Sequence, residues 1–142
     1  MTVPVHRRGE NKLQAYKDTV AMTSYTLQMC ENQKIFPKKC RWTICTKLID
    51  YCLDSIIKIQ QANTIKGTTP DEAKLRLKLQ REILYNFQAL WALMTVAYET
   101  YSIPSAKVDI WSQLMLTADN RVSAWRKYDM DRFKKVFGKN TN

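Results

Sequence analysis

The sequence predicts an all-α fold, an antiparallel up-down-up-down four-helix bundle over residues 11–127. Apolar residues recur at steps of three and four along four long stretches, and no proline or glycine interrupts the interior of any of them. The connections are short, so consecutive helices are expected to pack as antiparallel neighbours. The flanking segments are polar and basic: residues 1–10 are expected to form a loose N-terminal arm, and residues 128–142 a C-terminal tail with some helix.

The first helix is expected over about residues 11–30 and the second over about residues 39–63. Pro37 separates them, because proline disfavours a helical conformation in the residue before it. Gly67 ends the turn that follows the second helix. The apolar stripe of the first helix comprises Leu13, Tyr16, Val20, Leu27 and Cys30, and that of the second comprises Cys45, Leu48, Cys52, Ile56 and Ile59.

The third helix has the clearest start in the chain. Thr69 is expected as its N-cap, Pro70 as its first residue, and Glu72 as the partner of Thr69 in a capping box. This helix is expected to run to about Tyr101, and Ser105 is expected to cap the fourth helix. The core stripes are Leu79, Ile83, Phe87, Leu90, Met94, Ala97 and Tyr101 in the third helix, and Trp111, Leu114, Met115, Ala118, Val122 and Trp125 in the fourth.

The composition narrows the class of protein. The net charge of +10 indicates an anionic partner: nucleic acid first, then an anionic membrane surface or an acidic protein. The four cysteines form no CxxC pair and the single histidine is His6, so no metal site or cofactor is expected, and the thiols are expected to be reduced. No apolar signal segment and no apolar run of membrane-spanning length is present, so a cytoplasmic protein without membrane contact is expected.

No group of residues predicts an active site. His6 in a loose arm is a poor general base, and no serine or cysteine has a histidine partner at a recognisable spacing. Asp50 and Asp54 lie one helical turn apart and fit a solvated helix face better than acid–base catalysis. We therefore expect a binding protein and not an enzyme.

Basic residues are expected to gather at the two ends of the bundle, where spread cations suit contacts to phosphates. Three aromatic residues near one end, Trp125, Tyr128 and Phe133, are candidates for stacking on unpaired bases, although Trp125 fits the core better. The candidate nucleic-acid-binding residues are Lys38, Lys39 and Arg41 near the first connection, and Lys74, Arg76, Lys78, Arg81, Arg121, Arg126, Lys127, Arg132, Lys134 and Lys135 on the third helix, the fourth helix and the tail.

Arg41 and Arg76 project onto the core faces of their predicted helices. Each lies near a helix end, so it lines a wet end of the bundle, pairs with an acid such as Glu72, or binds an anion. If Arg76 binds an anion, Arg76→Ala is expected to weaken RNA binding and to leave thermal stability nearly unchanged. A large loss of stability with unchanged binding would make Arg76 structural.

The third helix carries a second apolar stripe beside its core stripe. Its members are spaced seven residues apart, and together the two stripes cover an arc of roughly 160°. This width indicates either a broad buried helix or a subunit and partner interface. The stripe comprises Leu77, Leu84, Trp91 and Tyr98.

Several segments over roughly residues 36–127 carry a family resemblance. They are Phe36-Pro37-Lys38-Lys39-Cys40-Arg41-Trp42-Thr43, the helix ending at Ala62-Asn63, the third helix with Leu75, Leu79 and Arg81, and Asn120-Arg121-Val122-Ser123-Ala124-Trp125-Arg126-Lys127. The chain resembles the accessory variability determinant (Avd) proteins of diversity-generating retroelements, within the four-helix-bundle family that includes ribosomal-RNA intervening-sequence proteins. It departs from the family where members often have glycine, at Cys45 and at Ser123 and Ala124.

The resemblance implies a basic homopentameric barrel of bacterial or phage origin. Such a barrel binds the reverse transcriptase of the element and its template-repeat RNA, with DNA as a further candidate partner. It supports adenine-directed mutagenic reverse transcription without catalysing it. Two alternatives stay open: an RNA- or ribosome-associated bundle without a retroelement, and a protein-interaction bundle whose charge serves solubility.

Overall fold

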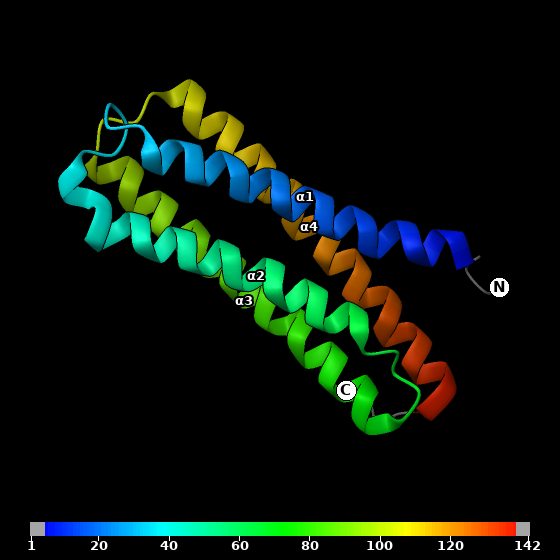
Figure 1. The fold of residues 1–142 in the computed structure, drawn as a ribbon. Helices are drawn as coiled ribbons and strands as arrows, with labels where there is room; N and C mark the ends of the chain where they lie inside the picture. Colours follow the sequence, from blue (N-terminus) through cyan, green and yellow to red (C-terminus); the bar gives the residue numbers. More distant parts are fainter. Residues whose placement is uncertain (1–4, 139–142) are drawn as a thin grey trace.

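The computed structural model describes the backbone of residues 5–138 and the side chains of residues 14–138. Within this part of the chain there are four long helices and no strand (Figure 1). A 3₁₀ turn and a π-helical turn precede the second long helix and lead directly into it. The elements are α1 (Val5–Glu31), η1 (Lys38–Cys40), η2 (Arg41–Cys45), α2 (Thr46–Thr64), α3 (Pro70–Thr100) and α4 (Ser105–Phe137).

The four helices run antiparallel in chain order and form a bundle (Figure 1). α1 packs against α2 and α4, and α3 packs against the same two helices, so each helix has two main neighbours. The connection between α1 and α2 and the connection between α3 and α4 lie at one end of the bundle, and the connection between α2 and α3 lies at the other (Figure 1). None of these helices, over the residues described, combines the length and apolar character needed to cross a membrane.

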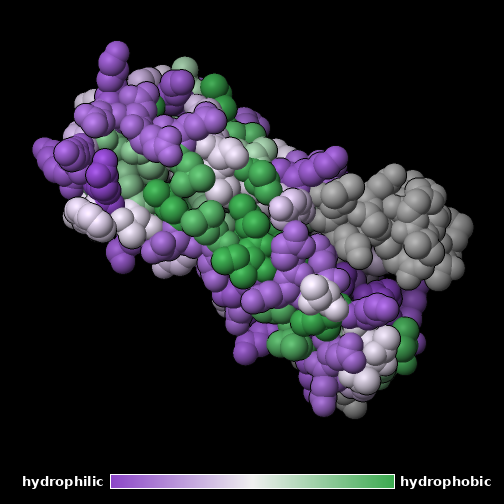
Figure 2. All heavy atoms as spheres, viewed as in Figure 1, coloured by the Kyte–Doolittle hydropathy of each residue, from purple (hydrophilic) through white to green (hydrophobic). Residues whose placement is uncertain are grey.

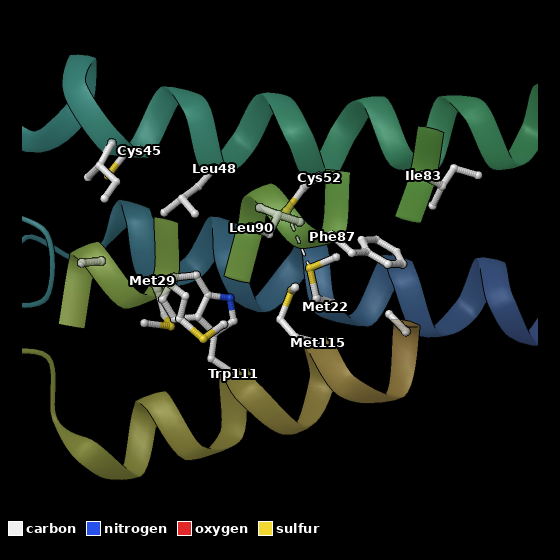
Figure 3. Close-up of a cluster of buried hydrophobic side chains, with 14 of the residues drawn as sticks. Met22, Met29, Cys45, Leu48, Cys52, Ile83, Phe87, Leu90, Trp111 and Met115 are labelled. Atoms are coloured by element: carbon white, nitrogen blue, oxygen red, sulfur yellow. Dashed lines mark hydrogen bonds between the residues drawn. The ribbon is translucent and has the colours of Figure 1, made fainter. Parts of the chain in front are cut away.

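The predicted stripes of α2, α3 and α4 form the core of the bundle. Most of their residues are buried, and Ile56, Leu79, Leu114 and Tyr101 at the margins are half-buried. Removing these side chains from water is the main source of stability for such a fold. Figure 3 shows Leu48 and Cys52 of α2, Phe87 and Leu90 of α3, and Trp111 and Met115 of α4 meeting in this cluster.

The predicted stripe of α1 is wrong. Its described members Tyr16, Val20, Leu27 and Cys30 are only half-buried, and Leu13 lies outside the described side chains. The buried face lies beside it and alternates threonines with small or sulfur-containing residues. That face comprises Ala15, Thr19, Met22, Thr23, Thr26 and Met29.

Two of the three threonines on this buried face have hydroxyls that the helix itself satisfies. Thr19 donates to the carbonyl of Ala15 and Thr26 to the carbonyl of Met22, each at 2.8 Å. The Thr26 hydroxyl also accepts the indole N–H of Trp111 at 2.9 Å, which links α1 to α4 through a buried polar contact. A pattern that treats threonine as polar therefore assigns the wrong face to the core.

The predicted N-terminal arm is helical from Val5, and the C-terminal segment contains more helix than expected. α1 begins at Val5, within the segment expected to be a loose arm; residues 1–4 lie outside the described chain. α4 continues to Phe137, through most of the segment expected to be a tail. Phe133 is buried there against Ala73 and Leu77 in a second, smaller apolar cluster, which explains why the helix extends past the main core.

The start of α3 confirms the predicted N-cap. The Thr69 hydroxyl accepts the backbone N–H of Glu72 at 3.2 Å, and Pro70 is the first helical residue. The Glu72 carboxylate accepts the hydroxyl of Thr68 at 3.1 Å, so only half of the predicted capping box is formed. Ser105 is the first residue of α4 and not its cap, which is Pro104 without a side-chain hydrogen bond.

Candidate nucleic-acid interface

Seven exposed or half-buried basic residues lie on α3 and α4, toward the end of the bundle that holds the α2–α3 connection (Figure 1). Arg126 of α4 bridges the two helices, because its Nε donates to the Leu77 carbonyl at 3.3 Å. Among the described residues, none of these cations is in an ion pair with a carboxylate. We call this set the α3/α4 basic surface: Lys74, Lys78, Arg81, Arg126, Lys127, Lys134 and Lys135.

Two arginines of this surface lie close enough to repel each other. Partial burial lowers the pKa of Arg126, and the like charge of Arg81 lowers it further. Tyr85, which is exposed on α3, raises the pKa of the same guanidinium. Two neighbouring cations without a carboxylate form a positive site that a phosphate group would neutralise.

Three predicted nucleic-acid ligands are occupied by carboxylates instead. Arg76 is buried and its Nε donates to Asp129 at 2.7 Å, so its charge is not available to a phosphate. Arg132 is half-buried, donates to the other oxygen of Asp129 at 3.1 Å and lies over the Phe133 ring. Arg121 is exposed but lies 3.3 Å from Asp18 of α1, on the side of α4 that faces α1.

Arg76 is the centre of a buried polar network that joins three segments. Its guanidinium also donates to the carbonyls of Ala62 at 3.0 Å and Ile65 at 2.8 Å, which lie at the end of α2. Gln80 of α3 donates to the same Asp129 oxygen at 2.7 Å. Of the roles left open by the sequence, the ion pair holds for Arg76, but the partner is Asp129 and not Glu72.

A second cationic surface lies at the opposite end of the bundle. Lys38, Lys39 and Arg41 are exposed there, on η1 and η2. Arg41 does not project onto the core as predicted. The N–H of Thr46 bonds to the Arg41 carbonyl, five residues earlier, so the π-helical turn shifts the register of the helix and buries Ile44 and Cys45 instead.

The aromatic residues proposed to stack on bases are not available for that role. Trp125 and Phe133 are buried, which confirms the core role of Trp125, and Tyr128 is half-buried. The exposed aromatics are others and include Tyr85 on α3, which acts on Arg126, and Trp42 on η2. Trp42 belongs to the motif that carries the family resemblance, but nothing in its sequence spacing separated it from a core tryptophan.

The second apolar stripe of α3 is not a continuous exposed face. Leu77 is buried with Phe133, and Leu84 and Trp91 are half-buried against the main core. Only Tyr98 is exposed. The broad buried helix therefore holds for Leu77, and the interface role of Leu84, Trp91 and Tyr98 stays a prediction.

The cysteines form no nucleophilic site. All four are free thiols, and the described residues contain no group of side chains able to hold a metal ion. Burial raises the pKa of Cys52 to about 11 and also raises the pKa of Cys30 and Cys45. Because the thiolate is the reactive form, burial makes these side chains poor nucleophiles at neutral pH.

This burial leads to a direct test on the native protein. At pH 8 we expect Cys52 to react with iodoacetamide roughly 100-fold more slowly than in urea, because the folded thiol is protonated and enclosed. The rates are measured by mass spectrometry of each cysteine peptide, with the urea-unfolded chain as the control. Equal rates in the two conditions would contradict the burial of Cys52 between α1 and α2.

The fold and its surface define the class of protein: an all-helical bundle with one cationic surface at each end. A scan against protein-family models gave no match, and searches of the curated proteins and of the solved structures gave none either.

Proposed function

We propose that this protein is a non-catalytic binding module for RNA. The α3/α4 basic surface is the observation that supports the proposal. Its cations stand on two rigid helices without carboxylate partners among the described residues, whereas Asp129, Asp54 and Asp18 are held by other cations. Cations left unpaired in this way suit the phosphate backbone, which supplies most of the affinity in nucleic-acid binding.

The resemblance to Avd proteins makes the proposal more specific. On that interpretation the protein is a cytoplasmic accessory factor of a diversity-generating retroelement, of bacterial or phage origin. It assembles as a homo-oligomer and binds reverse transcriptase and template RNA, with DNA as a further candidate. An RNA- or ribosome-associated bundle without a retroelement would use the same surface. The two roles differ in whether the protein co-purifies with a reverse transcriptase, which a pull-down with the purified enzyme measures.

A protein-interaction bundle is the second candidate, and a separate surface favours it. Figure 2 shows apolar side chains gathered over the middle of the face on which α2 lies, between hydrophilic ends. Leu53 and Ile57 of α2 are exposed and line a shallow groove with Asp50, Asp54 and Asn86. Exposed apolar residues beside acids suit a protein partner better than a phosphate backbone.

RNA binding across a salt series tests the proposed function. We expect the triple variant Lys74→Ala/Arg81→Ala/Lys127→Ala to bind a structured RNA roughly 10- to 100-fold more weakly than the unmodified chain at low salt, because fewer phosphates are neutralised and fewer counterions are released. The slope of log affinity against log salt is expected to become shallower by about one for each phosphate that the variant no longer neutralises.

The matched control removes the same charge elsewhere. Lys17 of α1 and Lys107 of α4 are exposed, and Arg121 of α4 is exposed but paired with Asp18. Replacing these three basic residues by alanine is expected to change the affinity several-fold less. Equal losses of affinity in the two triple variants would mean that RNA binding depends only on the net charge of the protein. No binding by the unmodified chain at moderate salt would reject the RNA proposal in favour of the protein-interaction bundle.

A further inference from the structure

Trp42 is the most exposed large apolar side chain in the described part of the protein. It is 81% exposed, compared with 58% for Tyr85, the next most exposed aromatic residue. The other three tryptophans are buried or half-buried. An indole exposed to this extent leaves its ring face accessible to a ligand, and covering that face would remove apolar surface from water.

Buried side chains and hydrogen bonds hold the backbone of the turn that carries Trp42. The residues buried beneath this turn are Ile35, Phe36, Cys40, Ile44 and Cys45. The ring of Phe36 meets the ring of Tyr101, at the end of α3, edge-on at 5.9 Å. The Thr46 hydroxyl donates to the carbonyl of Arg41 at 2.6 Å and the Thr43 hydroxyl to that of Cys40 at 3.3 Å. The turn that carries the indole therefore does not need to become ordered when a ligand binds.

The stretch of chain that carries Trp42 is cationic. Residues 32–49 contain five basic residues and no acid: Lys34, Lys38, Lys39, Arg41 and Lys47. All five are exposed, and none is in an ion pair within the described residues. The next exposed large apolar residue along the chain is Tyr51, nine positions further on, in α2. The anchor of a protein–protein interface is usually packed among apolar neighbours, and the chain on either side of Trp42 supplies exposed cations instead.

We propose that Trp42 is a stacking platform for an unpaired base of single-stranded RNA, with the lysines and Arg41 of the turn holding the adjacent phosphates. An aromatic face beside backbone-binding cations is the combination that captures single strands, because every base has a face to stack and every nucleotide a phosphate. A duplex keeps its bases stacked on each other and offers only phosphates. The inference rests on the proposed RNA-binding function and assigns this end of the bundle to single-stranded segments.

The test compares one single strand and one duplex. The probes are a fluorescein-labelled 12-nucleotide oligouridylate and a blunt 12-base-pair RNA duplex, titrated with the unmodified chain and with Trp42→Ala. We expect Trp42→Ala to weaken binding to the single strand about tenfold and binding to the duplex less than twofold. Trp42→Tyr is expected to keep most of the single-strand affinity. Tyr98→Ala, which removes another exposed aromatic side chain, is expected to keep all of it.

Three outcomes would overturn the inference, and they can be told apart. If the unmodified chain binds neither RNA, the proposed function fails together with the inference. If it binds both probes and Trp42→Ala changes neither, the proposed function stands and the stacking role fails. If Trp42→Ala instead loses binding to vesicles containing phosphatidylserine while RNA binding is unchanged, the turn is a membrane-surface anchor. Quenching of the red-edge tryptophan emission by oligouridylate, absent in Trp42→Ala, would support stacking directly.

Discussion

Arg76→Ala is expected to destabilise the bundle by about 3–5 kcal/mol, because it leaves Asp129 as a buried charge without its main partner. The carboxylate of Asp129 is almost completely enclosed, with 1% of the side chain exposed. The truncation also removes the hydrogen bonds that Arg76 donates to the Ala62 and Ile65 carbonyls, which fasten the end of α2 to α3. Urea unfolding followed by circular dichroism measures the effect.

A charge-neutral replacement separates the ion pair from packing. Arg76→Met/Asp129→Leu removes both enclosed charges, and Arg132, which loses Asp129 as its partner, is only half-buried, so we expect this double variant to be clearly more stable than Arg76→Ala. Arg81→Ala removes an exposed arginine from the same helix and is expected to change the free energy of unfolding by less than about 0.5 kcal/mol. Comparable losses in Arg76→Ala and Arg81→Ala would show that the network contributes nothing.

The same pair of variants separates structure from binding. Arg76→Ala is expected to lower stability and, measured well below its unfolding midpoint, to leave RNA affinity nearly unchanged. Arg81→Ala is expected to weaken RNA binding and to leave stability nearly unchanged. This reverses the expectation from the sequence, where Arg76 was a candidate phosphate ligand.

Gly67→Ala is expected to cost about 2–4 kcal/mol, for two reasons that act together. Gly67 has a φ of +79°, where a side chain costs roughly 1–2 kcal/mol. A Cβ at this position would also lie 2.6 Å from two ring carbons of Phe133, which is buried and has little room to move. The free energy of unfolding measures this cost.

A second glycine isolates the backbone contribution. Gly138 has almost the same φ, +78°, but an added Cβ would meet nothing within 4 Å. Gly138→Ala is therefore expected to cost no more than the backbone share. In a Phe133→Leu background, Gly67→Ala is expected to cost less than it does in the unmodified chain, because the smaller side chain leaves room for the methyl group. An unchanged cost in that background would mean that the close approach to Phe133 does not matter.

Local signals predicted the helices well. The cap at Thr69, the proline at Pro70 and the apolar repeat of α3 act within a few residues, and the structure has that helix where they indicate. The repeat failed in α1 because hydroxyls of Thr19 and Thr26 bond to their own helix, which a residue-type pattern cannot register. The apolar repeat also failed at Arg41, because the π-helical turn of Arg41–Cys45 puts these residues out of register with α2.

The candidate site was predicted only in outline. Charge and chain order placed basic residues at both ends of the bundle, and Arg81, Lys74 and Lys127 are exposed there as expected. Which cations are free, however, depends on where the acids lie. Asp129 lies in a charged stretch of the chain, and no sequence pattern marks it as buried. It forms ion pairs with Arg76 and with Arg132.

The sequence by itself determined the helical class, the order of the four helices and the excess of positive charge, because periodicity, capping and composition are local or additive properties. Only the tertiary structure decided which charges are buried, paired or free. Arg76 and Asp129 are 53 residues apart, and Gly67 meets Phe133 from a different element. Such contacts depend on the packing of whole helices, and the free energy of a polar side chain in the bundle depends on the partner that packing brings to it.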